Sequence, residues 1–296
     1  MKAVILAGGL GTRLSEETYD KPKPMVEIGG KPILWHIMKI YASHGIKDFI
    51  ICCGYKGYYI KEYFYNYSLH NSNVEFKLAD NDMQLKNNSA ENWSVNCVDT
   101  GPDTQTGGRL KRIEEYITPG ETFLFTYGDG VGDINIKEVI KSHRKSKKIA
   151  TVTAVNPPGR FGVLDIGDNG TVNKFDEKPK KGNSWINGGF FVLETDIFKY
   201  IEGDSMPWED DPLKKIAIEK QLNSYKHYGF WQPMDTIREK SILEEMYLLN
   251  KNFITLKISS GNRKSIKIVL LTKSINNNVK LYVSNADSLT FLIKNI

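Results

Sequence analysis

The sequence opens with MKAVILAGGLGTRL at residues 1–14 and continues to KPKPM at residues 21–25. Residues 3–7 are a short apolar run typical of a buried strand, and three of the next four residues are glycines, which leave the following backbone uncovered. A phosphate chain could lie directly against the N–H groups of such a loop. Arg13 adds a fork of donors, and Lys23 adds a point charge between two stiffening prolines. This stretch therefore predicts a nucleotide-phosphate site at the end of the first strand.

Two other glycine motifs fit the same stretch less well. The sequence contains no P-loop string, in which four residues separate the first glycine from Gly-Lys-Ser/Thr. The dinucleotide fingerprint requires Gly-x-Gly-x-x-Gly, whereas Gly11 is followed here by Thr12 and Arg13. An arginine at that place suits a triphosphate better than a compact dinucleotide turn.

Apolar runs alternate with helical patterns through the first half of the chain, which favours an α/β fold. We expect strands at 3–7, 49–53, 74–78, 123–126 and 150–155, and helices at 33–43, 105–116 and 136–145. Such alternation predicts a mixed, mostly parallel sheet with helices on both faces. Ligands bind at the carboxyl ends of such strands, where the glycine loop and residues 128–130 fall. Residues 80–104 are polar and poorly periodic, and we expect an excursion beside the pocket.

The composition is that of a soluble enzyme. The chain has 296 residues, and no apolar run reaches the roughly 20 residues that a membrane span needs. The first residues show no basic n-region, h-region and cleavage site, so no signal peptide is expected. The three cysteines, Cys52, Cys53 and Cys97, lack metal-ligand spacing and are expected to be reduced thiols. We therefore expect a cytoplasmic protein without membrane partners.

The net charge of +5 comes from the end of the chain. Residues 251–296 carry eight Lys or Arg and one Asp, so residues 1–250 hold 32 basic against 34 acidic side chains. The first 250 residues therefore carry no nucleic-acid signature. Three β-rich runs at 253–258, 266–271 and 279–283 indicate a basic β-rich tail at 251–296, separate from a domain at 1–250. A small β appendage, an oligomer contact and a reading-frame change are the open explanations for this tail.

The glycine loop and the KPKP string resemble those of the sugar-1-phosphate nucleotidyltransferases. The resemblance runs in order to about residue 250 and is most specific for their glucose-1-phosphate cytidylyltransferase branch, through GGKPILWH at 29–36, TGGRLKR at 106–112, FTYGDG at 125–130, PGRFG at 158–162, FDEKP at 175–179, INGGFF at 186–191 and GFWQPMDT at 229–236. It implies the Rossmann-like fold of nucleotide-diphospho-sugar transferases. It also implies Mg²⁺-assisted transfer of a cytidylyl group from CTP to α-D-glucose 1-phosphate, giving CDP-glucose and pyrophosphate.

The same resemblance assigns site residues. Asp129 and Asp235 match the paired metal aspartates, although alone they read as a turn acid and a helix N-cap. Lys23 and Arg13 match the catalytic cations at the phosphates. The implied nucleotide contacts are Leu6, Ala7, Gly8, Gly9, Leu10, Gly11, Thr12, Arg13, Lys23, Thr104, Arg109 and Gly128. The implied sugar-phosphate contacts are Glu177, Lys178, Asn187 and Gly188. Without the family, Arg109 would read as a charge on a helix surface.

Two alternatives to CTP-dependent catalysis remain open. The string LSEET at 14–18 lacks the proline that thymidylyl and uridylyl relatives usually carry, which favours CTP, but UTP or dTTP could serve with the same sugar phosphate. Some nucleotidyltransferase-like domains are noncatalytic nucleotide-binding regulatory subunits, which usually lack one of the key charged residues. Family members also form homo-oligomers, so self-association is expected here.

Overall fold

The structure is a computed structural model, and it describes residues 1–157, 163–166, 171–176, 184–251, 253–256, 267–271, 280–285 and 288–291. The chain divides into two units, which are described separately. The first comprises residues 1–27 and 31–236, and the second comprises residues 28–30 and 237–296.

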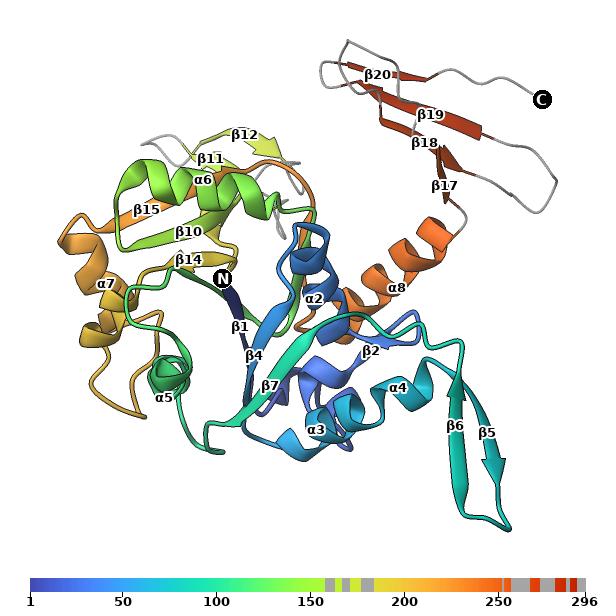
Figure 1. Cartoon of the computed structure of the whole chain (residues 1–296). Coiled ribbons are helices and arrows are strands. Elements are labelled where there is room, and N and C mark those ends of the chain that lie inside the picture. Colours follow the sequence, from blue (N-terminus) through green and yellow to red (C-terminus); the bar gives the residue numbers. More distant parts are fainter. Residues whose placement is uncertain are drawn as a thin grey trace. The chain divides into compact units, whose positions relative to one another are not determined.

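A mixed, mostly parallel eight-stranded sheet forms the centre of the first unit (Figure 1). Its strands follow the order β13 (Ile186–Asn187), β10 (Ala150–Val155), β14 (Phe191–Leu193), β8 (Phe123–Tyr127), β1 (Lys2–Ala7), β4 (Asp48–Cys53) and β7 (Ser94–Asp99), and β15 (Leu222–His227) pairs with β10. The strands β8, β1, β4 and β7 are parallel, whereas β14 is antiparallel to both of its neighbours. The predicted α/β fold is confirmed.

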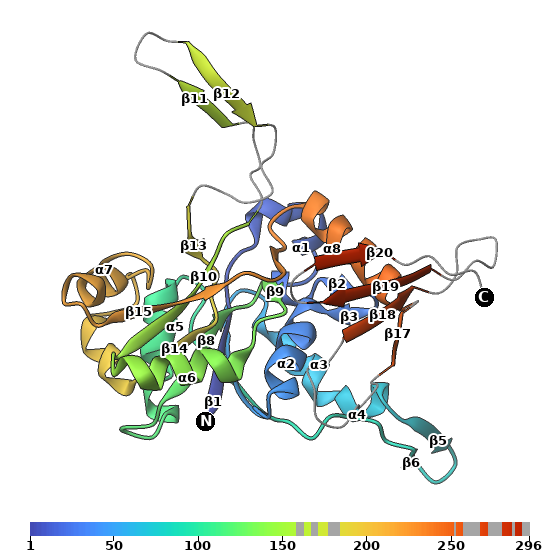
Figure 2. The ribbon, with the colours of Figure 1, turned by 90° about the horizontal axis from the view of Figure 1, so that it is seen from above.

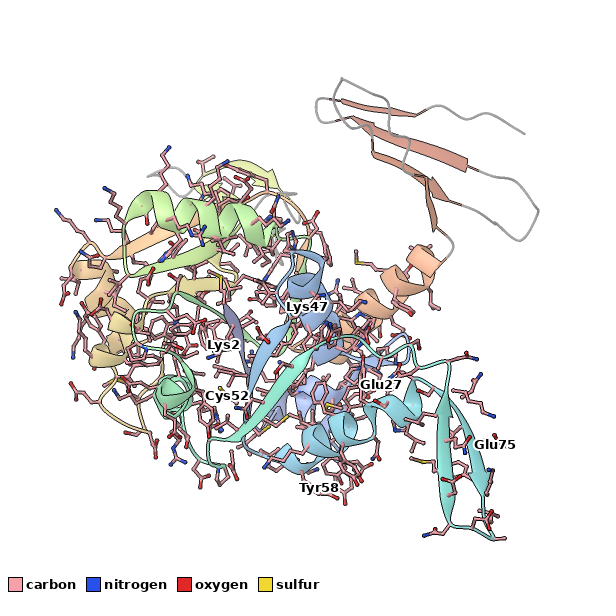
Figure 3. The ribbon with its side chains drawn as sticks, viewed as in Figure 1. Lys2, Glu27, Lys47, Cys52, Tyr58 and Glu75 are labelled. Carbon is pink, nitrogen blue, oxygen red and sulfur yellow. The ribbon has the colours of Figure 1, made fainter. Side chains whose placement is uncertain are left out.

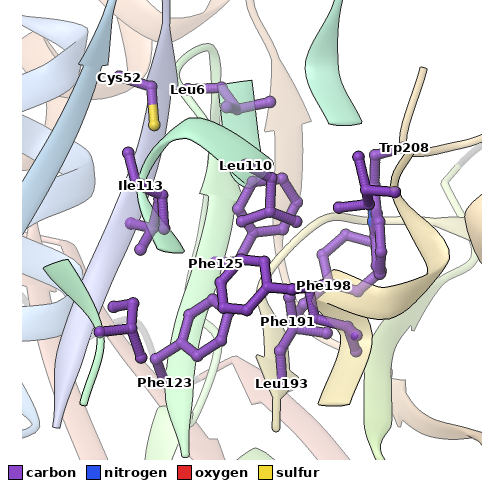
Figure 4. Packing of buried hydrophobic residues seen from close by; sticks show 14 of the residues in the cluster. Leu6, Cys52, Leu110, Ile113, Phe123, Phe125, Phe191, Leu193, Phe198 and Trp208 are labelled. Atoms are coloured by element: carbon purple, nitrogen blue, oxygen red, sulfur yellow. The ribbon is translucent and has the colours of Figure 1, made fainter. Parts of the chain in front are cut away.

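Helices cover both faces of this sheet, because its strands carry apolar side chains on both sides. Val4 and Leu6 face one cluster, which includes Leu110 of α5 (Thr106–Arg112) and Trp208 (Figure 4). Intervening strand residues such as Ile5 are equally buried. The other helices are α1 (Ser15–Thr18), α2 (Ile33–Ser43), α3 (Gly57–Tyr65), α4 (Tyr67–His70), α6 (Ile136–Ser146) and α7 (Asp211–Ile218), with 3₁₀ turns η1 (Thr12–Leu14), η2 (Lys23–Met25), η3 (Glu114–Tyr116) and η4 (Thr195–Tyr200).

Short strands lie outside the central sheet. The hairpin β5 (Asn73–Lys77) and β6 (Asp82–Lys86) projects from the body, as the position of Glu75 in Figure 3 shows. The pair β11 (Val163–Ile166) and β12 (Val172–Asp176) forms a second hairpin (Figure 2). The pair β9 (Gly130–Gly132) and β16 (Trp231–Pro233) is the one that bears on the site. Two further strands are β2 (Glu27–Ile28) and β3 (Lys31–Pro32).

Two expectations from the sequence were wrong. Residues 80–104 are no irregular excursion, because they supply β6 and also β7, an edge strand of the main sheet. Their last residues, 102–104, do line the cavity described below, as expected. An edge strand exposes alternate residues to solvent, so its sequence looks polar. The helix expected at 105–116 divides into α5 and the 3₁₀ turn η3.

The second unit contains one helix and a small sheet. Helix α8 (Ile237–Lys251) precedes a four-stranded antiparallel sheet of β17 (Phe253–Leu256), β18 (Lys267–Leu271), β19 (Lys280–Asn285) and β20 (Ser288–Phe291). The β-rich character expected of this segment is therefore present. Among the residues described in both units, no helix is long and apolar enough to cross a membrane.

Candidate active site

The site begins in the two loops that follow the neighbouring parallel strands β1 and β8. The chain runs from β1 outward to β4 and β7, and then returns to β8 on the other side of β1, so these loops meet where the strand order reverses. Open α/β sheets bind ligands at such a point. The loops touch there, because a Cβ atom on Gly128 would lie only 2.3 Å from the carbonyl oxygen of Leu6.

A cavity of about 620 Å³ opens between these loops and the segment that leads into α5. This volume lies within the range of small-molecule sites. All the residues expected to contact the nucleotide line it: Leu6, Ala7, Gly8, Gly9, Leu10, Gly11, Thr12, Arg13, Lys23, Thr104, Arg109 and Gly128. Asp129 lines it too. The structure thus brings the set together, while its role in nucleotide binding stays a prediction.

Arg109 occupies a buried position beneath the glycine loop, with 4% of its surface exposed. Its Nη2 atom donates to the carbonyl oxygens of Gly8 and Pro102, both at 3.0 Å. Its Nη1 atom donates to Cys53 O at 3.3 Å, Thr100 Oγ1 at 2.8 Å and Gly101 O at 2.6 Å. Burial lowers the pKa of this guanidinium from its ordinary value. Arg109 therefore ties together three loops that surround the cavity, rather than lying on a helix surface.

The close approach of Arg109 explains two of the glycines. A Cβ atom on Gly8 would lie 2.2 Å from Arg109 Nη1, and one on Gly54 would lie 2.3 Å from the same atom. The carbonyl of Gly8 also accepts from the Tyr55 amide at 3.1 Å. The backbone at the start of the glycine loop is thus fixed from two sides, which pre-organises the loop before a ligand binds.

Asp129 and Asp235 are brought together by the short antiparallel pair β9 and β16. Asp129 immediately precedes β9, and Asp235 is the second residue after β16. The register Pro233↔Gly130 sets these two ends side by side, and the Met234 amide donates to Asp129 O at 2.8 Å. The two carboxylates, far apart in the sequence, therefore belong to one site.

Lys23 lies between these carboxylates. Its Nζ atom donates to Asp129 Oδ2 and to Asp235 Oδ1, both at 2.6 Å. The Lys23 side chain is 11% exposed, and burial alone would lower its pKa. The charges of the two carboxylates and their hydrogen bonds outweigh this effect, so the pKa of Lys23 is raised. Arg13 Nη1 donates to Asp235 Oδ2 at 3.2 Å from a side chain that is 75% exposed.

The carboxylate pair fits a divalent cation such as Mg²⁺. One oxygen from each aspartate already faces a single cationic atom, the Lys23 nitrogen, at the same distance. Mg²⁺ is typically held by one or two carboxylates together with phosphate oxygens and water. No group of three or more His, Cys, Asp or Glu suited to a metal occurs among the described residues. A metal here would therefore need ligands from a phosphorylated substrate or from water.

Of the residues expected to hold the sugar phosphate, Asn187 and Gly188 are described, whereas Glu177 and Lys178 lie outside the described residues. The Asn187 side chain accepts from the Gly189 amide at 2.8 Å and donates to the Tyr127 hydroxyl at 3.1 Å. Gly188 O accepts from the Trp231 indole at 2.8 Å, and a Cβ atom on Gly188 would lie 2.6 Å from Val155. These contacts fix Asn187 and Gly188 beside the cavity-lining residue Tyr127.

Comparison with known proteins identifies the family. The family model described as nucleotidyl transferase matches residues 2–236. The chain belongs to the nucleotidyl transferase family. It is 60% identical over 247 residues to the glucose-1-phosphate cytidylyltransferase of Salmonella typhimurium, spanning 83% of this chain and 96% of that protein. It is 45% identical to a probable glucose-1-phosphate cytidylyltransferase of Bacillus subtilis, spanning 85% and 97%. The resemblance to this branch is confirmed.

Solved structures agree with the fold of this nucleotidyl transferase. The crystal structure of HddC from Yersinia pseudotuberculosis has a TM-score of 0.60 and 25% sequence identity, and the match spans 83% of this chain and 99% of HddC. A UDP-glucose pyrophosphorylase solved with UDP-glucose, at 16% identity, also has a TM-score of 0.60 over 83% and 98% of the two chains.

Sequence reasoning missed several residues of this site. Tyr127 and Thr106 line the cavity, and Glu209 bonds to Thr106 from a distant loop. Tyr127 could have been found, because it directly precedes Gly128 and Asp129 at the end of a recognised strand. Glu209 gave no comparable signal, since it stands in the acidic string EDD at 209–211, which reads as a solvated surface.

Proposed function

We propose that this chain transfers a cytidylyl group from CTP to α-D-glucose 1-phosphate, giving CDP-glucose and pyrophosphate. One observation carries the chemistry: Lys23, Arg13, Asp129 and Asp235 converge beside a glycine-lined cavity. The choice of substrates is supported by 60% identity to a glucose-1-phosphate cytidylyltransferase over 96% of its length.

The reaction is an in-line substitution at the α-phosphorus of CTP. An oxygen of the glucose 1-phosphate forms the new bond to that phosphorus, and the bond to the bridging oxygen of the β-phosphate breaks, so that pyrophosphate leaves with the electron pair. The nucleophile is already an anion near neutral pH, so no general base is required. The barrier lies in bringing two anions together, so catalysis rests on positioning and charge neutralisation.

Lys23 and Arg13 supply the fixed positive charge. The raised pKa of Lys23 keeps its ammonium group charged throughout the physiological range. Its low exposure strengthens its field, because a partly buried charge is screened less by solvent. Lys23 would stabilise the α-phosphate in the transition state, and the exposed fork of Arg13 would bind the outer phosphates. Both must then turn from the carboxylates toward the phosphates.

Asp129 and Asp235 would hold the Mg²⁺ ion. The bound metal would neutralise charge on phosphate oxygens and orient them. The chain's own contribution is the pair of carboxylates, whose relative position is set by the β9–β16 ladder. Lys23 compensates the repulsion between them through a hydrogen bond to each.

The base would lie near Thr104 and Arg109, with backbone groups of residues 6–9 available to a pyrimidine. Use of UTP or dTTP is the runner-up, and a noncatalytic nucleotide-binding subunit is the less favoured alternative. The charged residues that such subunits usually lose are all present here. Homo-oligomerisation, cytoplasmic location and the separate role of residues 251–296 stay predictions.

Mg²⁺-dependent pyrophosphate release tests this proposal. The protein is assayed with glucose 1-phosphate and each of CTP, UTP, dTTP, GTP and ATP. We expect strong preference for CTP. Preference for UTP or dTTP would retain the mechanism and reject the base assignment. A folded protein that binds CTP but is inactive with every nucleotide would favour the regulatory alternative.

A further inference from the structure

A carboxylate that the chemistry above does not use is bonded to a residue that lines the cavity. Glu209 belongs to the loop between η4 and α7, and its Oε2 atom accepts from Thr106 Oγ1 at 2.6 Å. Thr106 Oγ1 accepts in turn from the Trp208 amide at 2.8 Å. Thr106 lines the cavity, and Trp208 is fully buried. Two hydrogen bonds and a buried anchor therefore hold the Glu209 carboxylate beside the cavity, although Glu209 itself is exposed.

Tyr127 connects Glu209 to Asn187. The Tyr127 hydroxyl accepts from Asn187 Nδ2 at 3.1 Å. Burial raises the pKa of Tyr127 above its ordinary value, and the charge of Glu209 and a hydrogen bond to it raise the pKa further. The hydroxyl therefore keeps its proton in the field of the Glu209 carboxylate. Asn187, Tyr127 and Glu209 form a row of polar groups, and its middle member lines the cavity.

The charge distribution indicates which part of a substrate this row can bind. Lys23 and Arg13 attract phosphates, whereas the Glu209 carboxylate repels them. An ionised carboxylate is an acceptor with two oxygens, and the hydroxyls of a hexose are donors. A hexose phosphate would therefore bind with its phosphate toward the cations and its hydroxyls toward Glu209.

We propose that Glu209 binds hydroxyl groups of the hexose and, with Tyr127 and Asn187, determines which hexose 1-phosphate is accepted. This inference rests on the proposed function, and it identifies the residues that would contact the hexose. Hydrogen bonds to a charged group contribute enough that losing one costs roughly 10-fold or more in kcat/KM.

Steady-state kinetics of the full-length protein test the assignment. We expect Glu209→Gln to lower kcat/KM for glucose 1-phosphate roughly 10-fold through a higher KM, because a neutral amide accepts more weakly than a carboxylate. KM for CTP should stay at the wild-type value. Glu202→Gln is the matched control, because Glu202 is also an exposed acid but pairs with Lys215, at 3.7 Å, which does not line the cavity. It should change neither constant.

Deoxy substrates separate a direct contact from a structural role. Glucose 1-phosphates lacking the 2-, 3-, 4- or 6-hydroxyl are compared in the wild type and in Glu209→Gln. For one of these substrates, we expect the wild type to be less active than with glucose 1-phosphate. The variant should be equally active with that substrate and with glucose 1-phosphate, because it lacks the hydrogen bond in both cases. If each deoxy substrate lowered kcat/KM by the same factor in both proteins, Glu209 would have only a structural role in its loop, and the proposal would be overturned.

Two further outcomes also decide the question. A changed CTP-to-UTP preference with an unchanged KM for the hexose phosphate would place Glu209 at the base and overturn the proposal. If the wild type turns over no nucleotide with glucose 1-phosphate, the proposed function fails. Calorimetric titration of wild type and Glu209→Ala with glucose 1-phosphate then tests the contact separately. Equal binding would overturn the inference, whereas weaker binding by the variant would support it.

Discussion

Replacing Arg109 by lysine tests whether the cavity depends on a buried guanidinium. Arg109 makes five hydrogen bonds, to Gly8, Cys53, Thr100, Gly101 and Pro102. A lysine keeps the charge but has only three donors on one atom, so at least two of the five hydrogen bonds are lost. At about 1 kcal/mol for each lost hydrogen bond, the expected cost is about 2 kcal/mol. For a unit of this size, that lowers Tm by roughly 4–8 °C.

The effect should extend to the nucleotide. Gly8 would keep its bond from the Tyr55 amide but lose the guanidinium beneath it. The glycine loop would then be less ordered before CTP binds, and the binding free energy would have to order it. We expect KM for CTP to rise about 10-fold, which corresponds to about 1.4 kcal/mol.

Arg112→Lys is the matched control. Arg112 lies on the same helix and pairs with Asp204 through Nε at 2.9 Å and Nη2 at 2.5 Å, but its side chain is 43% exposed. Exposed ion pairs contribute little to stability, so this variant should unfold and turn over like the wild type. Thermal unfolding and CTP kinetics are measured for both variants. Equal Tm and KM values in Arg109→Lys and Arg112→Lys would refute the reasoning.

Four other predictions concern the charge of Lys23, the two aspartates, Gly8 and the pH dependence of stability. Lys23→Ala should lower kcat roughly 10²-fold or more in a folded protein, and near-normal turnover would reject its catalytic role. Asp129→Asn and Asp235→Asn should each weaken the Mg²⁺ dependence of turnover, whereas unchanged Mg²⁺ titrations would remove the pair from the metal site. Gly8→Ala should destabilise the protein by about 1–3 kcal/mol in urea unfolding, since the new methyl group would meet Arg109 at 2.2 Å. Because the folded pKa of Lys23 is raised, its stabilising effect should be complete below about pH 10.4 and be lost only as pH rises through the folded value. A difference in stability between wild type and Lys23→Met that stays the same over the whole alkaline range would contradict this.

Local patterns predicted the parts of the site that a single segment encodes. The apolar run and the glycines of residues 3–11 specify a buried strand and an uncovered loop, and both are present at the expected place. Strands β4 and β10 were equally predictable, because both lie inside a sheet that is covered on its two faces and their residues are mostly buried. The edge strand β7 was missed because Val98 is its one buried residue, whereas the others are half-buried or exposed.

The role of Arg109 illustrates what a local pattern cannot supply. Arg109 is a basic residue in the short helix α5, and a basic residue in such a helix ordinarily lies on a solvated surface. Its acceptors come from the ends of β1 and β4 and from the segment before α5, so they become visible only after the sheet has assembled. Glu209 has the same character, because its contact with Thr106 spans 103 residues.

The pairing of Asp129 and Asp235 depends on a feature too short to recognise in the sequence. Strands β9 and β16 have three residues each, and β16 ends in a proline, which alone would argue against a strand. Each aspartate therefore reads as a turn acid or a helix cap until the other is placed beside it. Once paired, the two carboxylates require a cation between them, and the Lys23 ammonium group meets that requirement. The ammonium group that balances the two carboxylates is thus one that phosphates would also attract. Its movement toward them would leave Asp129 and Asp235 able to hold a metal, with Arg13 still beside Asp235.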